Sequence, residues 1–328
     1  MKKSELFRQF NVSIDLAVEA HELLRGETGT EIPGVKMDVD NLEHAKVTTI
    51  TIETDQGVEE MGRPKGQYIT IDAPEIRQNN YIIHKEITEI LADKLISLMD
   101  LKEDSNVLLV GLGNWNATPD ALGPQVIEKS LVTRHLFQYS PTELKGKLRK
   151  VSAIAPGVLG LTGIETAEII KGLVEHVKPD LVIAIDALAA GSLDRIGTSI
   201  QLADTGINPG SGVGNKRVGL NMETLGCKVI AIGLPTVMNA AVIANNCLEA
   251  LKDQLKTSPS LYKLYKELNP MAFQQILDEV LSPYSGNLMV TPKEIDTLIE
   301  STARIIAGAL SISIHPGINS EDYEMYIQ

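Results

Sequence analysis

One stretch, from Asn106 to Pro124, constrains the fold of this chain more than any other. It reads NVLLVGLGNWNATPDALGP, an apolar run followed by glycines, a Thr-Pro-Asp triplet and the start of a helical pattern over residues 121–136. An apolar run between polar residues is typical of a strand buried on both faces. The triplet is typical of a helix start, because threonine caps, proline suits the first turn and aspartate favours the positive end of the helix dipole. The stretch therefore predicts a strand, a glycine loop and a helix, with Asp120 beyond the carboxyl end of the strand.

A second apolar run is followed by an acid in the same way. Residues 181–185 read LVIAI, and Asp186 comes next. Ligands of open α/β sheets bind at the carboxyl ends of the strands, so two neighbouring parallel strands would direct Asp120 and Asp186 into one crevice. Two acids in one site titrate as a pair, and together they can activate a water and protonate a leaving amine. Helix capping is the alternative role for Asp120.

Other residues at predicted strand ends are further candidates for the crevice. Gly111, Gly113 and Asn114 follow the first strand, where the backbone must turn tightly or approach a neighbour closely. Thr236 follows the predicted strand 228–233 and precedes a helical pattern, so it would lie at the same edge of the sheet. We therefore expect these four residues to border the two aspartates.

The rest of the chain predicts an α/β fold, a doubly wound and mostly parallel sheet with helices on both faces. From residue 106 onward, apolar runs alternate with helical patterns, which is the signature of this class. Strands are predicted at 47–52, 68–71, 107–110, 151–155, 181–185 and 228–233, and helices at 85–99, 121–136, 163–177, 237–251 and 292–310. We expect a single domain over residues 16–328, preceded by a loose N-terminal segment, 1–15.

Residues 191–226 interrupt this alternation. They contain eight glycines and few long apolar runs, and they are too many for a simple connection. The segment is interpreted as a Gly-rich β-hairpin excursion or surface flap, or as a loop that covers the crevice. Its run NPGSGVGN, residues 208–215, lacks the Lys-Ser/Thr end of a phosphate-binding loop, so we expect no nucleotide there.

Composition narrows the classes of function. The net charge of −13 argues against direct nucleic-acid binding, because phosphates would be repelled. The first ten residues lack the apolar core of a secretory signal, and no run of about 18 apolar residues predicts a membrane helix. Two cysteines, Cys227 and Cys247, fit a reducing cytoplasm. The six scattered histidines form no metal motif and no GxSxG is present, which leaves the two aspartates as the main catalytic candidates.

Three motifs resemble the germination protease family of spore-forming bacteria: GLGNWNATPDALGP, PDLVIAIDALAAG and DLAVEAHELL. The resemblance extends over essentially the whole chain. It implies an endopeptidase without a cofactor, made as a zymogen, that degrades small acid-soluble spore proteins at germination. It also implies a homotetramer in the cytoplasm of the forespore and spore core, with Asp120 and Asp186 as catalytic acids of an unconventional aspartic mechanism.

The resemblance further implies removal of a short N-terminal segment. The family cuts after an acidic residue, before a hydrophobic residue followed by alanine. Asp15, Leu16 and Ala17 fit these positions and predict a cut between Asp15 and Leu16, although Val12 stands where the family prefers a further acid.

More distantly, VLLVGLGN followed by an acid and Gly-Pro resembles the hydrogenase maturation proteases. Those enzymes use a histidine from a later strand end as a third metal ligand. Residues 234–239 contain no histidine, so we expect no metal site. Two alternatives stay open: a metal-assisted peptidase with the same acids as ligands, and a non-catalytic α/β protein whose acids bind a cationic ligand.

Overall fold

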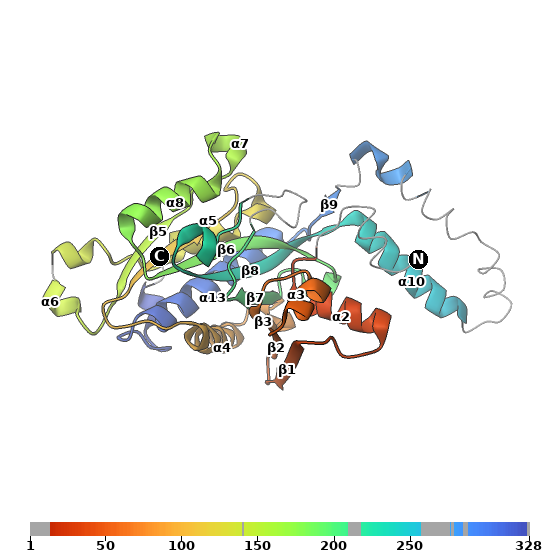
Figure 1. Ribbon diagram of the computed structural model, residues 1–328, viewed down its shortest axis with the longest axis horizontal. Helices are drawn as coiled ribbons and strands as arrows, with labels where there is room; N and C mark the ends of the chain where they lie inside the picture. The colour runs from red at the N-terminus through yellow and green to blue at the C-terminus, as the bar shows by residue number, and fades with distance from the viewer. Residues whose placement is uncertain are drawn as a thin grey trace.

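The computed structural model describes residues 14–139, 141–208, 218–256, 276, 279–284 and 288–326. A mixed sheet of nine strands runs through it, and helices cover both faces (Figure 1). The strands are β1 (Val35–Asn41), β2 (Lys46–Ile52), β3 (Gly66–Asp72), β4 (Asn106–Gly111), β5 (Lys150–Ile154), β6 (Leu181–Ala190), β7 (Ser199–Ala203), β8 (Lys228–Asn239) and β9 (Met289–Val290). They lie in the order β1-β2-β3-β7-β8-β6-β4-β5, and β9 pairs with β8. The predicted α/β fold with helices on both faces is confirmed.

The sheet is parallel only in one half. Strands β5, β4, β6 and β8 are parallel, whereas β1, β2, β3 and β7 form an antiparallel half that joins β8 through β7. The prediction of a mostly parallel sheet therefore holds for the four strands at 106–111, 150–154, 181–190 and 228–239, and the sheet as a whole is mixed.

The strand β7 also corrects the interpretation of residues 191–226. All five residues of β7 are buried, and the strand lies between β3 and β8 in the middle of the sheet. Residues 199–203 are therefore a structural strand, and the flap interpretation is wrong for them. The glycine-rich part, 209–217, lies outside the described residues.

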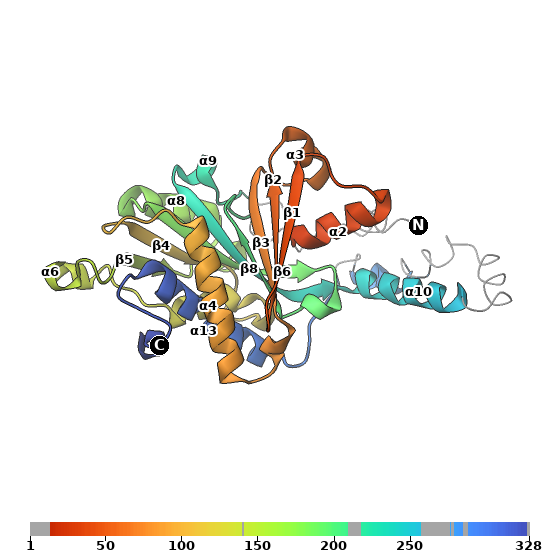
Figure 2. The ribbon, with the colours of Figure 1, turned by 90° about the horizontal axis from the view of Figure 1, so that it is seen from below.

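The α-helices are α2 (Ala17–Thr28), α3 (Asp55–Met61), α4 (Tyr81–Leu98), α5 (Leu122–Lys129), α6 (Pro141–Leu144), α7 (Leu159–Thr162), α8 (Thr166–Val177), α9 (Met222–Leu225), α10 (Ala240–Lys256) and α13 (Ile295–Ile314). Helices α4, α5 and α13 cover one face of the sheet (Figure 2). On the other face, α2 and α3 cover the antiparallel half, and α8 and α9 cover the parallel half. The two layers of helices leave the ends of the parallel strands as the edge where a site can form.

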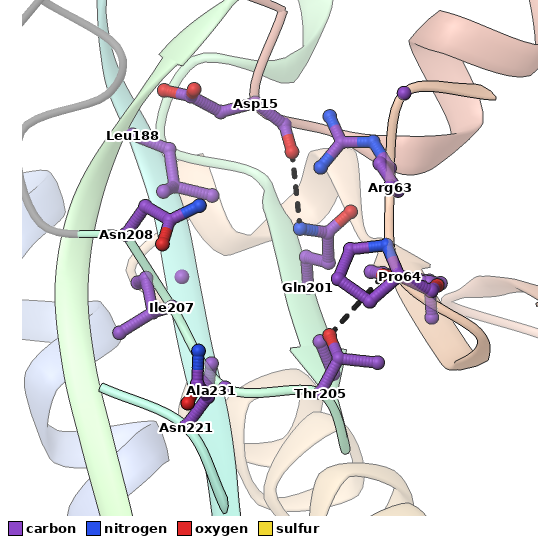
Figure 3. Close-up of a pocket in the computed structure, with 15 residues that line it drawn as sticks. Asp15, Arg63, Pro64, Leu188, Gln201, Thr205, Ile207, Asn208, Asn221 and Ala231 are labelled. Atoms are coloured by element: carbon purple, nitrogen blue, oxygen red, sulfur yellow. Dashed lines mark hydrogen bonds between the residues drawn. The ribbon is translucent and has the colours of Figure 1, made fainter. Parts of the chain in front are cut away.

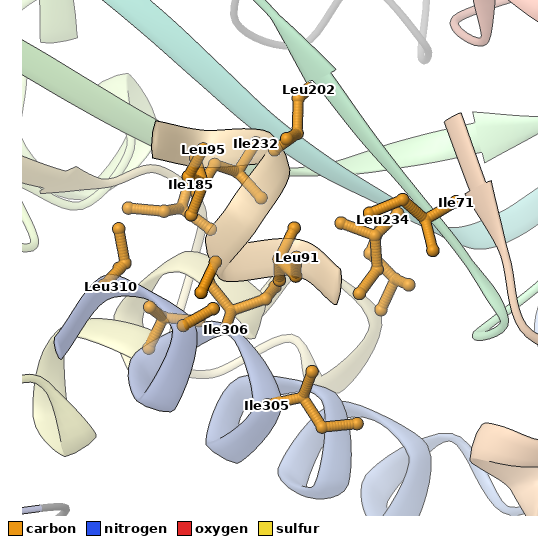
Figure 4. Close-up of a cluster of buried hydrophobic side chains, with 14 of the residues drawn as sticks. Ile71, Leu91, Leu95, Ile185, Leu202, Ile232, Leu234, Ile305, Ile306 and Leu310 are labelled. Atoms are coloured by element: carbon orange, nitrogen blue, oxygen red, sulfur yellow. The ribbon is translucent and has the colours of Figure 1, made fainter. Parts of the chain in front are cut away.

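The largest apolar core lies between the sheet, α4 and α13 (Figure 4). Helix α4 begins after Asn80, whose side chain accepts a hydrogen bond from the backbone N–H of Ile82. Its Leu91 and Leu95 recur at helical spacing and are fully buried, as is Ile306 of α13. By length and composition α13 could cross a membrane, but 72% of its apolar window is buried inside the protein, as in the core helix of a globular domain.

Several element boundaries differ from the prediction, and three of them bear on the candidate site. Strands β6 and β8 run on to Ala190 and Asn239, because residues 187–190 and 234–238 continue to pair with each other. Helix α5 ends at Lys129, seven residues earlier than predicted, and the following Ser130 is extended. Asp186 and Thr236 therefore lie within strands.

Candidate functional site

The strand order places a topological switch point between β4 and β6. From β4 the chain passes to β5 on one side, and it then returns to β6 on the other side. In open α/β sheets ligands bind at such a point, outside the carboxyl ends of the strands. Strand β4 ends at Gly111, which pairs with Ile185, so Asp186 is the first residue of β6 past the end of β4. Asp186 therefore faces the edge where β4 stops.

Asp120 is carried to the same edge by the loop that follows β4. It ends the 3-10 helix η2 (Thr118–Asp120), which contacts both β6 and β8. The N–H of Leu112 donates to the carbonyl of Ile185 at 2.8 Å, and the N–H of Asn114 donates to the carbonyl of Asp120 at 2.9 Å. These two hydrogen bonds fix the loop to the strand of Asp186 and to Asp120 itself, so one short segment positions both acids.

A glycine is required in this loop at position 113. Gly113 has a φ of +116°, and a Cβ atom built on it would lie 2.0 Å from the carbonyl oxygen of Asp120. Any side chain would therefore push Asp120 away from the sheet. Gly111 has a packing role, because its Cβ position lies 2.3 Å from the carbonyl oxygen of Gly123 in α5.

The two acids differ in their surroundings. Asp186 is 6% exposed, and its Oδ1 accepts a hydrogen bond of 2.9 Å from the N–H of Ala187. Asp120 is partly exposed. Both side chains have further interactions in the protein. A buried and a partly exposed carboxyl at one strand edge have the unequal environments that an acid and a base need.

The two remaining predicted crevice residues, Asn114 and Thr236, lie at different positions relative to the two acids. Asn114 is half-buried beside Asp120, and its Oδ1 accepts a hydrogen bond from the N–H of Asn116 at 3.0 Å, which stiffens the loop. Thr236 is 1% exposed and falls at the irregularity between β6 and β8, three residues past Gly233, the partner of Asp186. Its hydroxyl has no hydrogen-bond partner among the described residues. The structure thus groups Asn114 with the acids, whereas Thr236 lies further along β8 and is buried.

Asp15 and Leu16 are not part of a loose arm. Asp15 is 7% exposed, and its Oδ2 accepts a hydrogen bond of 2.8 Å from the N–H of Ala189 in β6. Leu16 is fully buried and serves as the N-cap residue of α2. The expectation of a loose segment is wrong at its end, and residues 1–13 lie outside the described residues. Cleavage between Asp15 and Leu16 therefore requires local opening of this segment.

A charged cluster around Arg195 was not predicted from the sequence. Arg195 lies within 4 Å of Glu19, Glu22 and Asp72, which come from α2 and β3. Burial raises the pKa of Glu19 to about 7, against the lowering effects of the Gly191 N–H and of Arg195. The cluster ties α2 to the end of β6, because Glu19 also accepts a hydrogen bond of 2.7 Å from Gly191.

A cavity of about 190 Å³ beside Asp15 was also missed (Figure 3). Arg63 and Gln201 line it, from the turn after α3 and from β7. In the sequence, Arg63 belongs to a charged run between two glycines, and no local pattern distinguishes it from a surface residue. Within the described parts of the chain, no group of three or more His, Cys, Asp or Glu side chains could hold a metal ion.

Comparison with known proteins agrees with the sequence motifs. The family model described as germination protease matches residues 15–256 and 254–327. The chain belongs to the germination protease family. The germination protease of Caldanaerobacter subterraneus subsp. tengcongensis is 47% identical over 315 residues, covering 95% of this chain and 96% of the relative. The germination protease of Clostridium tetani is 44% identical, and the match covers 97% of this chain and 99% of the relative. The germination protease of Bacillus subtilis is 39% identical, and the match covers 99% of this chain and 100% of the relative.

The family membership makes this chain a spore protease and confirms the resemblance read from its motifs. Among solved structures, a NiFe hydrogenase maturation protease from Thermococcus kodakarensis KOD1 matches with 20% identity, over 66% of this chain and 99% of its own. The TM-score of that match is 0.34.

Proposed function

We propose that this germination protease is an endopeptidase in which Asp120 and Asp186 act as an acid/base pair. The observation that supports this most is the loop 112–120, which is bonded to Ile185 of β6 and to Asp120 and so holds both acids at one switch point. In this mechanism, an ionised carboxylate takes a proton from the attacking water. The other carboxyl, in its protonated form, gives a proton to the leaving amine, and no cofactor is needed.

The proposed substrates are the small acid-soluble spore proteins. A net charge of −13 favours approach of basic or neutral proteins over acidic ones. We propose that the enzyme cuts after an acidic residue, before a hydrophobic residue followed by alanine, and that it works as a homotetramer in the cytoplasm of the forespore and spore core.

The same proposal includes a zymogen. Residues 1–15 would restrain the enzyme until the bond between Asp15 and Leu16 is cut. The burial of Asp15 against Ala189 supports a restraint, because a segment that is held in place can bias a conformational equilibrium. The test compares a chain that starts at Leu16 with full-length Asp15→Ala, which lacks the acid before the cut. Higher activity of the shorter chain is expected, and equal activity on the same substrate would exclude a zymogen.

Incubation with a purified small basic spore protein tests the mechanism. Cleavage that continues in the presence of a chelator supports the aspartic pair. Cleavage that stops with the chelator and returns with a divalent cation supports the metal-assisted alternative. If the full-length and the processed chain both leave the substrate intact, the non-catalytic binding protein is the better interpretation.

A further inference from the structure

The chain's own residues 14–17, which lead into helix α2, are bound through their backbone as a peptide would be. Arg63 Nη2 donates to the carbonyl of Ile14. Gln201 Nε2 donates to the carbonyl of Asp15 at 3.3 Å (Figure 3). The N–H of Ala17 donates to Gln201 Oε1 at 2.6 Å. Two side chains thus bind backbone groups of Ile14, Asp15 and Ala17. Contacts to the backbone do not depend on the sequence of the bound segment.

One contact in this segment depends on the side chain. The carboxylate of Asp15 accepts a hydrogen bond from the N–H of Ala189 at 2.8 Å. Burial lowers the pKa of Arg63, and the charge of Asp15 opposes that lowering. A carboxylate at this position therefore meets a backbone donor and a nearby guanidinium. An amide or an apolar group there would remove the carboxylate that contributes most to compensating the buried guanidinium charge.

Arg63 has unused capacity toward an anion. Its Nε is fully buried and has no hydrogen-bond partner among the described residues. The cavity beside it is lined by further polar side chains, Gln201, Asn208 and Asn221. Guanidinium has five N–H donors in a planar fork that matches a carboxylate, so Arg63 keeps a donor for an anionic group that enters this cavity.

The cavity lies next to Asp186, one of the two proposed acids. Gly233 lines it and is the register partner of Asp186, and Leu188 lines it two residues along β6. Alternate residues of a strand share one face of the sheet, so Asp186 and Leu188 point to the same side. A peptide held as residues 14–17 are held would therefore run past the face that carries Asp186.

We propose that this pocket is the subsite for an acidic side chain of the peptide substrate, at the place that Asp15 takes in this structure. Arg63 and the N–H of Ala189 are the specificity-determining groups, and Gln201 binds the substrate backbone. The inference rests on the proposed endopeptidase function. It explains why the segment that ends at Asp15 must leave before a substrate enters, since both use the same donors.

Two peptides that differ only by Glu or Gln before the cut bond test this subsite. They are given to wild type and to Arg63→Gln, in whichever form of the chain, full-length or processed, cleaves the basic spore protein. Wild type should prefer the Glu peptide by about tenfold or more in kcat/KM, since a hydrogen bond to a charged group contributes on that scale. Arg63→Gln should bring the ratio close to one, mainly through KM. Arg63→Lys keeps the charge without the fork, so its ratio should lie in between.

Arg25→Gln is the matched control, because this exposed arginine pairs with Glu31 at the surface. It should keep the wild-type ratio. Thermal unfolding shows which variants are folded, and the Lys variant carries the test if Arg63→Gln does not fold. A folded Arg63 variant with the wild-type ratio, or a wild type that cleaves both peptides equally, overturns the subsite while the endopeptidase function stands. A wild type that cleaves neither the peptides nor the spore protein refutes the function itself.

Discussion

Replacing Glu19 by Gln is expected to remove a pH dependence from the stability of this protein. Glu19 is 6% exposed, and burial raises the pKa of its carboxyl from 4.5 to about 7. Between these values the folded state keeps a proton that the unfolded state releases. The free energy of unfolding therefore falls as the pH rises from 4.5 to about 7, and Glu19 contributes no further change above that. At about 1.4 kcal/mol per pH unit, the decrease amounts to roughly 3 kcal/mol.

Urea unfolding of wild type and Glu19→Gln, between about pH 4.5 and about pH 8, measures this effect. Gln can still accept the hydrogen bond from Gly191 but does not ionise. As the pH rises across this range, the free energy of unfolding of the variant should therefore increase by up to about 3 kcal/mol relative to that of wild type. Glu31→Gln, at a side chain that is 71% exposed, is the control and should follow the wild-type profile. Parallel profiles for wild type and Glu19→Gln would refute the assignment of a raised pKa to this buried carboxyl.

Three further outcomes are expected from single substitutions. Asp120→Asn and Asp186→Asn should each lower kcat by about 100-fold or more while thermal unfolding stays close to wild type. The exposed Asp93→Asn is the control, and near-normal turnover by either site variant would contradict the pair. Gly113→Ala should cost about 1–3 kcal/mol in urea unfolding and lower kcat, because its Cβ would lie 2.0 Å from the carbonyl oxygen of Asp120. Unchanged stability and turnover would show that the loop does not position Asp120. Leu91→Ala should lower the free energy of unfolding by about 2–5 kcal/mol, because it leaves a cavity in the core. The kcat of the folded enzyme should be retained.

The sequence alone was sufficient where the signal is local. The apolar runs before Gly111 and before Asp186 predict buried strands, and the glycine loop and Thr-Pro-Asp triplet place Asp120 near the end of the first strand. The structure confirms the α/β fold. These features depend on residues a few positions apart, and hydrophobic periodicity and backbone restrictions act over that distance.

The polar strands show where local patterns stop being informative. Strand β1 is mostly exposed at the edge of the sheet, so it lacks the apolar alternation that marks a half-buried strand. Strand β7 follows a glycine-containing connection, and only its pairing with β3 and β8 defines it as part of the sheet. Pairing partners far apart in the chain decide such strands, because tertiary contacts override weak propensities.

The same limit applies to the region around Asp15. In the sequence, Asp15 ends a polar segment and Arg63 stands in a charged run, and both look like surface residues. In the folded chain, Asp15 contacts Ala189, 174 positions away, and Gln201 binds the carbonyl of Asp15 and the N–H of Ala17. The sequence predicted that Asp120 comes after the strand β4 and that Asp186 directly follows the apolar run of β6. Only the tertiary structure decided that Asp15 and Arg63 lie beside β6, because burial and charge pairing arise from contacts between segments that no local pattern connects.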